Sequence, residues 1–307
     1  DAVLSTGLLG HVIDRHAGAA VTVACGPLAA PLFAATPGVS RVIAWPKRRA
    51  GGHWLRLWAT ALPRFWHLAI DLRGSALPYF LFARRRLVLR PSRTPVHRVR
   101  HLGALLGLRD PPAPRVAVAE SQRADARRLL PPGAPVLALG STANWGGKVW
   151  PAERFAALAA RLTAKGAILA GARVAVFGAA SERAMAAPLL AALPAETCID
   201  LVGRADLLTA AACLERAALF VGNDSGLMHL AAAIGTPTLG LFGPSREELY
   251  GPWGAHCASV RAEQSFEDII GRPDYDYRRQ ESHMLSLRVD KVVAAAEALW
   301  RRRSAAA

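Results

Sequence analysis

The fold can be inferred from Leu219-Phe-Val-Gly-Asn-Asp224-Ser-Gly-Leu-Met-His229-Leu-Ala-Ala-Ala-Ile-Gly-Thr-Pro-Thr238. An apolar strand stops at Gly222, polar residues suited to capping follow, and a helix rich in small residues begins at Ser225. A second apolar strand starts at Thr236. A strand, a helix and a strand in such close succession are typical of a parallel α/β sheet.

The same alternation extends outward over the whole chain. Towards the C-terminus it predicts strands over 136–140, 173–177, 197–202, 219–222 and 236–242, with helices over 151–165, 181–193, 206–217, 225–234 and 290–303. Towards the N-terminus it predicts strands over 20–26, 39–45, 68–74 and 84–90, with helices over 27–35, 53–67, 75–83 and 96–108. We therefore predict an α/β fold of two Rossmann-like domains whose parallel sheets face each other across a cleft.

The domain boundary is expected at Pro131-Pro-Gly-Ala-Pro135, which gives an N-terminal domain of residues 1–132 and a C-terminal domain of residues 133–307. The chain opens directly on a helical pattern, so the first strand of the N-terminal domain is expected to be missing from this sequence. The last helix is expected to pack back on the N-terminal domain.

Charge is distributed unevenly between these halves. The 307 residues carry a formal charge of +15. Residues 1–132 hold 20 basic and 6 acidic residues, net +14, whereas 133–307 hold 18 and 17, net +1. This asymmetry indicates a polyanionic partner for the N-terminal half, or else an arginine-rich source proteome. With 52% hydrophobic residues the chain is no disordered basic tail, and it has no apolar run of about 18 residues that would predict a membrane-spanning helix.

The helix that begins near Ser225 is a candidate anion site, because its first N–H groups have no partner within the helix. Asp224 can cap it, the Ser225 hydroxyl can donate, Gly226 permits close backbone approach, and His229 follows one turn later. The alternative is that Asp224 only caps the helix and His229 is a buried structural histidine.

A second candidate segment is Leu139-Gly-Ser-Thr-Ala-Asn144-Trp-Gly-Gly-Lys148-Val-Trp-Pro151. Here a strand ends in a glycine-rich loop that delivers one lysine just before a helix. A lysine in this position is a point charge for phosphate, although the segment is not a Walker A motif.

Together, the Lys148 segment and the Asp224 segment resemble glycosyltransferase family 9, the ADP-heptose:lipopolysaccharide heptosyltransferases and their relatives. Asp71-Leu-Arg-Gly-Ser75 is similar to that family's N-terminal signature, and the opening Asp1-Ala-Val-Leu-Ser-Thr is similar to the end of its first loop. The resemblance implies a GT-B fold and an inverting, metal-independent glycosyltransferase. It implies transfer of a sugar, heptose by preference, from an ADP-sugar to a lipopolysaccharide-core or related envelope glycan.

The resemblance also assigns roles. It implies Asp1 as the catalytic base and a set of donor diphosphate and sugar ligands: Asn144, Lys148, Asp224, Ser225, Gly226 and His229. Glu182 is a candidate ribose ligand, with a solvated acid at a helix start as the equal alternative. No cofactor and no metal are expected, since Asp274-Tyr-Asp276 lies in a polar loop and the histidines lack metal-ligand spacing.

For the basic N-terminal half, the resemblance implies an anionic lipid-linked glycan as the partner. Candidate acceptor-binding residues are Lys47, Arg48, Arg49, Arg84, Arg85 and Arg86. The aromatic residues Trp54, Trp58, Phe65 and Trp66 fit either a membrane interface or a core helix. We expect a cytoplasmic protein, peripheral on the inner face of the bacterial inner membrane. The rival hypotheses are a catalytically inactive relative that binds nucleotide sugar or glycan, and a basic nucleic-acid-binding protein, for which no reader motif is found.

Overall fold

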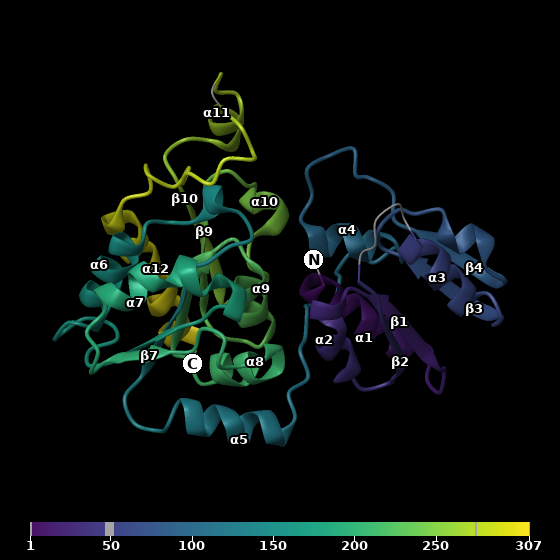
Figure 1. Cartoon of the computed structure of the whole chain (residues 1–307), viewed down its shortest axis with the longest axis horizontal. Coiled ribbons are helices and arrows are strands. Elements are labelled where there is room, and N and C mark those ends of the chain that lie inside the picture. The colour runs from purple at the N-terminus through teal and green to yellow at the C-terminus, as the bar shows by residue number, and fades with distance from the viewer. Residues whose placement is uncertain (1, 47–51, 274, 307) are drawn as a thin grey trace. The chain divides into compact units, whose positions relative to one another are not determined.

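The computed structural model describes residues 2–46, 52–273 and 275–306. They form two compact units, unit 1 (Asp1–Ala117) and unit 2 (Val118–Ala307), whose elements Figure 1 labels. Among the described residues, no helix is both long and apolar enough to cross a bilayer.

Unit 1 contains two pairs of parallel strands, β1 with β2 and β3 with β4. Its elements are η1 (Val3–Ser5), α1 (Thr6–Arg15), β1 (Val21–Cys25), η2 (Pro27–Ala29), α2 (Ala30–Ala34), β2 (Val39–Ala44), α3 (Gly52–Ala61), β3 (Trp66–Asp71), η4 (Leu77–Phe80), β4 (Ala83–Val88) and α4 (Arg98–Ala104). Most residues of these strands are only half-buried. The expected parallel β-α-β alternation is present.

Two expected helices of unit 1 are wrong in extent. The helix predicted over 53–67 ends at Ala61, because Pro63 disfavours helical backbone at the residue before it, and Trp66 opens β3 instead. The helix predicted over 75–83 is the short 3₁₀ turn η4, and Ala83 already belongs to β4. The aromatic run 54–66 is therefore split between a helix and a strand.

Unit 2 is built on one six-stranded sheet of order β10-β9-β8-β5-β6-β7, in which every pairing is parallel. Its strands are β5 (Val136–Gly140), β6 (Arg173–Val176), β7 (Cys198–Asp200), β8 (Leu219–Asn223), β9 (Thr238–Phe242) and β10 (Cys257–Arg261). Its helices are α5 (Glu120–Leu129), η5 (Gly146–Lys148), α6 (Ala152–Thr163), η6 (Ala180–Glu182), α7 (Arg183–Ala192), α8 (Leu207–Glu215), α9 (Gly226–Ala233), α10 (Glu247–Tyr250), α11 (Phe266–Ile270) and α12 (Val289–Ala306). The sheet confirms the predicted α/β class.

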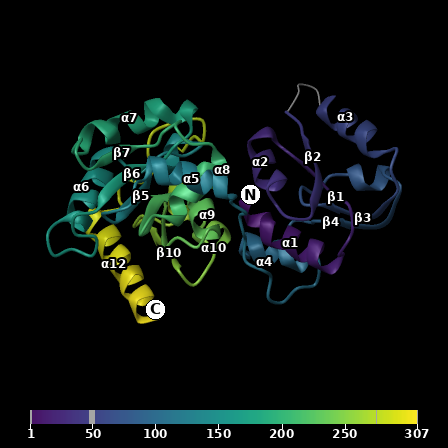
Figure 2. The ribbon, with the colours of Figure 1, turned by 90° about the horizontal axis from the view of Figure 1, so that it is seen from below.

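Helices cover both faces of this sheet, with α6 and α12 on one side and α8 and α9 on the other (Figure 2). The largest fully buried side chains include Trp150 and Phe155, whose rings pack edge to face with their centroids 4.9 Å apart. Because β5, β8 and β9 are buried along their whole length, they read as continuous apolar runs, as central parallel strands do.

Residues 118–132 belong to unit 2, whereas the linker at residues 131–135 predicts that they belong to the first domain. The reason is α5, which packs against α8 and whose Arg123 donates to both oxygens of Glu215 at 2.9 Å. Helix α12 contacts α6, β9 and β10 within unit 2. Packing of this helix on the N-terminal domain stays a prediction.

Glycines bring the carboxyl ends of the two central strands together. Gly140 of β5 pairs with Gly222 of β8, and the ring of Phe220 fills the space beside both. A Cβ at either glycine would lie 2.6 Å from that ring, so neither position admits a side chain without repacking. Gly140 and Gly222 therefore leave room for the Phe220 ring in the core, and the loops that follow them leave the sheet side by side.

Candidate functional site at the carboxyl edge of the six-stranded sheet

Lys148 and Asp224 lie 76 residues apart in sequence and meet at this edge of the sheet. The Lys148 ammonium donates to Asp224 Oδ2 at 2.6 Å, and the two side chains are 23% and 8% exposed. An ammonium has three N–H donors, so this contact leaves two for another acceptor. The pair thus holds a cation in place without saturating it.

Asn223, the last residue of β8, ties the two candidate segments together. Its side chain is fully buried, its Oδ1 accepts from the Trp150 amide at 3.1 Å, and its Nδ2 donates to the Ser141 carbonyl at 2.9 Å. These bonds fix the loop that carries Lys148 to the strand that presents Asp224. Asn223 is not among the site residues predicted from sequence, although an amide closing an apolar strand is a detectable signal.

Helix α9 begins immediately after this strand and its polar end. Ser225 is the N-cap residue, yet its side chain makes no hydrogen bond to the helix, and its buried hydroxyl has no partner. Gly226 is exposed, and a Cβ there would meet nothing within 4 Å. His229 is buried one turn later. The open amino end of α9 therefore offers free N–H groups and a positive dipole end beside Lys148.

A segment late in the chain covers the Lys148 loop. Gln280 Oε1 accepts from the Gly146 amide at 2.9 Å, and the Trp145 indole N–H donates to the Arg279 carbonyl at 2.7 Å. Ser282 donates to the Val149 carbonyl at 2.6 Å. A Cβ at Gly146 would lie 2.2 Å from the Gln280 carbonyl oxygen, which explains the glycine there. Sequence reasoning missed this contribution, because the segment has no regular periodicity.

Glu182 and Asn144 lie on neighbouring loops of the same edge. Glu182 Oε2 accepts from Thr142 Oγ1 at 3.0 Å and from the Ala179 amide at 2.8 Å, so the carboxylate links the end of β5 to the turn after β6. Asn144 is exposed on the Lys148 loop. Both positions are compatible with ligand contact, and Glu182 also has a capping role.

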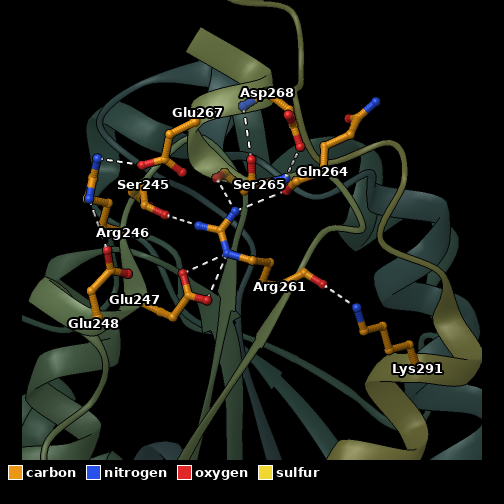
Figure 3. Close-up of polar contacts among 11 residues, drawn as sticks. Ser245, Arg246, Glu247, Glu248, Arg261, Gln264, Ser265, Glu267, Asp268 and Lys291 are labelled. Carbon is orange, nitrogen blue, oxygen red and sulfur yellow. Dashed lines mark hydrogen bonds and ion pairs between the residues drawn. The ribbon is translucent and has the colours of Figure 1, made fainter. Parts of the chain in front are cut away.

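An arginine clamp stabilises the loop after β9 (Figure 3). Arg261, at the end of β10, donates from Nε to both oxygens of Glu247 at 2.8 and 2.7 Å. Its other nitrogens donate to the carbonyls of Gly243 at 3.1 Å and Ser245 at 2.6 Å. Nearby, hydrogen bonds from Ser265 hold the pKa of Asp268 below its usual range. The clamp therefore ties the loop that follows Phe242 to the end of β10.

The remaining candidates fall outside this edge or outside the described residues. Asp1, Lys47, Arg48, Arg49 and Asp274 are among those not described. In unit 1, Arg84 and Arg85 are exposed on β4, while Arg86 donates to the Pro78 carbonyl at 2.8 Å and to the Leu81 carbonyl at 2.8 Å. Arg86 therefore also has a structural role. The part of the chain that is described has no cluster of three or more His, Cys, Asp or Glu side chains able to hold a metal ion.

The chemistry of the edge favours a phosphorylated ligand. Lys148, the free N–H groups of α9 and the unpartnered Ser225 hydroxyl offer donors and positive potential over one helix turn. The carboxyl edge of an open parallel sheet is where ligands of such folds bind.

Comparison with known proteins agrees with this geometry. Residues 68–269 match the family described as glycosyltransferase family 9 (heptosyltransferase). The chain is 33% identical over 131 residues to a lipooligosaccharide heptosyltransferase 2 of Haemophilus influenzae, an alignment covering 41% of this chain and 36% of that protein. It is 27% identical over 301 residues to a lipopolysaccharide heptosyltransferase 2 of Salmonella typhimurium, covering 85% and 84%.

Among solved structures, the E. coli ADP-heptose lps heptosyltransferase II superposes with a TM-score of 0.78. That match covers 98% of this chain and 96% of the other at 21% identity, a similarity of fold.

Proposed function

Because the chain belongs to glycosyltransferase family 9 and has its GT-B fold, we propose that it transfers heptose from an ADP-sugar to an anionic lipopolysaccharide-core or related envelope glycan. The observation that carries this proposal is the Lys148–Asp224 pair at the open amino end of α9. Membership in the family favours a glycosyltransferase over a nucleic-acid-binding protein. The names of the relatives support heptose and lipopolysaccharide, and the similarity in fold to an ADP-heptose heptosyltransferase of E. coli supports ADP-heptose as the donor.

The donor diphosphate binds at the start of α9 in this proposal. Lys148 donates to a phosphate oxygen with the N–H groups that Asp224 leaves available, and the Ser225 hydroxyl donates to another. Gly226 lets the phosphate approach the backbone, while Asn144 and His229 border the sugar. Glu182 accepts from the ribose hydroxyls when its bond from Thr142 is exchanged.

The reaction is a single displacement. The acceptor hydroxyl oxygen bonds to the anomeric carbon, the bond from that carbon to the diphosphate oxygen breaks, and a carboxylate takes the hydroxyl proton. We assign the carboxylate to Asp1. ADP leaves with the electron pair, and Lys148 with the N–H groups of α9 stabilises its developing charge. One displacement inverts the anomeric configuration, and these donors supply the positive charge without a metal ion.

The acceptor is anionic in this proposal, which fits the charge of unit 1. Residues 1–117 hold 17 basic and 4 acidic residues. We assign acceptor contacts to Lys47, Arg48 and Arg49 and to the basic residues of β4, and we propose a cytoplasmic location, where the ADP-sugar would be available.

Calorimetry with ADP tests the donor site. Lys148→Met retains the aliphatic stem and loses the charge-assisted bond, so we expect ADP affinity to fall ten- to a hundredfold, about 1.5–3 kcal/mol. Asp224→Asn should weaken ADP binding less, because Lys148 keeps its charge.

The matched controls are Lys165→Met and Glu196→Gln, both exposed residues of unit 2, which should leave ADP affinity unchanged. Wild-type ADP affinity in Lys148→Met would refute the proposed donor site, provided that circular dichroism shows the variant folded.

A further inference from the structure

Unit 1 exposes an unusual set of apolar side chains. Among the described residues nine large hydrophobic side chains are exposed, and five of them lie between positions 55 and 82. These five, which we call the aromatic edge, are Leu55 (67% exposed), Phe65 (66%), Tyr79 (61%), Phe80 (66%) and Phe82 (64%). Contact of such side chains with water is unfavourable in proportion to their area, and several exposed large apolar side chains within one short segment indicate an interaction site.

Hydrogen bonds hold the backbone of the aromatic edge in place. The Trp66 amide donates to the Phe82 carbonyl at 2.8 Å, which sets Phe65 and Phe82 at the same end of the β3–β4 pair. The Trp58 indole donates to the Phe80 carbonyl at 3.0 Å, and α3 contacts η4. Figure 1 shows α3, β3 and β4 gathered in one part of unit 1. Phe65 and Phe82 thus immediately precede β3 and β4, and Tyr79 and Phe80 lie in η4 between these strands.

Exposed basic residues lie next to these rings in the sequence. Arg64 precedes Phe65, and the exposed Arg84 and Arg85 are the second and third residues of β4, which begins just after Phe82. Between positions 41 and 109 the sequence has 15 basic residues and one acid, Asp71. The Asp71 carboxylate accepts from the Arg73 amide at 2.6 Å and the Ser75 amide at 3.2 Å, so it shapes its own turn. The aromatic edge thus lies in a segment whose charge is almost wholly basic.

We propose that the aromatic edge, with Arg64, Arg84 and Arg85, docks the protein on an anionic lipid surface. Phenylalanine and leucine side chains have no polar atom and gain most from the boundary between headgroups and acyl chains, while arginine pairs with lipid phosphates. Positive charge beside exposed rings is attracted to an anionic bilayer and gains no such attraction from a neutral one, so we expect the surface to prefer anionic lipid. The purpose of the surface rests on the proposed function, since a lipid-linked acceptor lies at a membrane.

Vesicle sedimentation tests the proposal. Vesicles of phosphatidylethanolamine and phosphatidylglycerol at 3:1 should bind the full chain at least tenfold more strongly than phosphatidylcholine vesicles. The double variant Phe80→Ala/Phe82→Ala should lose at least tenfold of that partitioning. The control Leu28→Ala removes a side chain that is 92% exposed in the same unit, and it should bind as the wild type does.

Two further readouts separate the outcomes. Equal vesicle binding by Phe80→Ala/Phe82→Ala and wild type, or no binding by wild type, would overturn the proposal. A change of oligomeric state in the double variant during analytical ultracentrifugation would overturn it in favour of a protein interface, and salt-sensitive binding of RNA lost in the variant would favour nucleic acid. Transfer to a deacylated, water-soluble acceptor should be unchanged in the double variant. Failure of wild type in that transfer assay would count against the proposed function, with vesicle binding unaffected.

Discussion

The parallel strands of the two units differ in burial, and the units differ in charge. In unit 2 the central strands β5, β8 and β9 are buried at every residue, and basic and acidic residues nearly balance at 21 and 19. In unit 1 the strands form two separate pairs, most of their residues are half-buried or exposed, and basic residues outnumber acidic ones 17 to 4. Unit 2 thus has a buried sheet with nearly balanced charge, which carries the proposed donor site, whereas unit 1 has a basic exterior with exposed apolar side chains.

The largest expected effect concerns packing in the two units. Phe220→Ala in unit 2 removes a fully buried ring that fills the space beside Gly140 and Gly222, and should cost about 3–5 kcal/mol of unfolding free energy. Phe82→Ala in unit 1 removes a ring that is 64% exposed and should change stability by no more than about 0.5 kcal/mol. Urea unfolding measures both, and similar costs for the two variants would remove the contrast between the units.

A smaller effect is expected at Asn223, whose hydrogen bonds affect both the stability of unit 2 and the position of the Lys148 loop. Asn223→Ala leaves the Trp150 amide and the Ser141 carbonyl without their partner, at about 1–3 kcal/mol for each buried polar group. The loop carrying Lys148 should loosen as well, so ADP affinity should fall together with stability. Asn144→Ala is the matched control for stability, because Asn144 is exposed on the same loop. If Asn223→Ala unfolds at the wild-type urea concentration, the two loops are not coupled through this amide.

The smallest effect is a pH dependence at a paired charge of unit 2. Burial raises the pKa of Asp200, but hydrogen bonds from Arg183 and the Val202 amide outweigh it, and the pKa lies below its usual value. Asp200 therefore stabilises the fold above the carboxyl's ordinary pKa of about 4, and this contribution is lost as pH falls through the lowered value. Arg183 is 47% exposed, so we expect less than about 1 kcal/mol from the pair.

Asp200→Asn tests this directly. The variant should be less stable than wild type at pH 7, and the difference should shrink as pH falls through the lowered pKa of wild-type Asp200 and its carboxylate becomes protonated. A stability difference that stays constant over this whole range would show that the charge of Asp200 is not its source.

Sequence patterns predicted the buried central strands of unit 2 closely but missed two other elements of that unit, for physical reasons. Strands such as Leu219–Asn223 are continuous apolar runs between capping residues, and their helices have clear periodicity. Helix α5 escaped prediction because its sequence, Glu120–Leu129, is largely charged and polar and shows only Ala126 buried. Strand β10 escaped because Cys257–Arg261 is short and mixed in character.

Some residues of the candidate site could likewise be predicted from sequence, and others could not. Lys148 and Asp224 could be selected from sequence, because each follows an apolar strand and carboxyl ends of parallel strands share one edge. The clamp of Arg261 and the cover supplied by Gln280 could not, since both depend on tertiary contacts between loops without periodicity. In unit 1 the sequence did not decide whether the aromatic run 54–66 packs in the core or faces an interface. The structure exposes Phe65 and half-buries Trp58 and Trp66, so the run contains side chains of both kinds.

The proposed function as a whole requires that the preformed site of unit 2 activates an ADP-sugar for inverting transfer to an anionic glycan. The most direct measurement is to incubate the full chain with ADP-heptose and a lipopolysaccharide-core acceptor, and to follow ADP release together with the anomeric configuration of the product by NMR. We expect one ADP for each glycan formed, with the configuration inverted, and loss of both in Lys148→Met. Retained configuration, or ADP release without a glycan product, would contradict the proposed transfer.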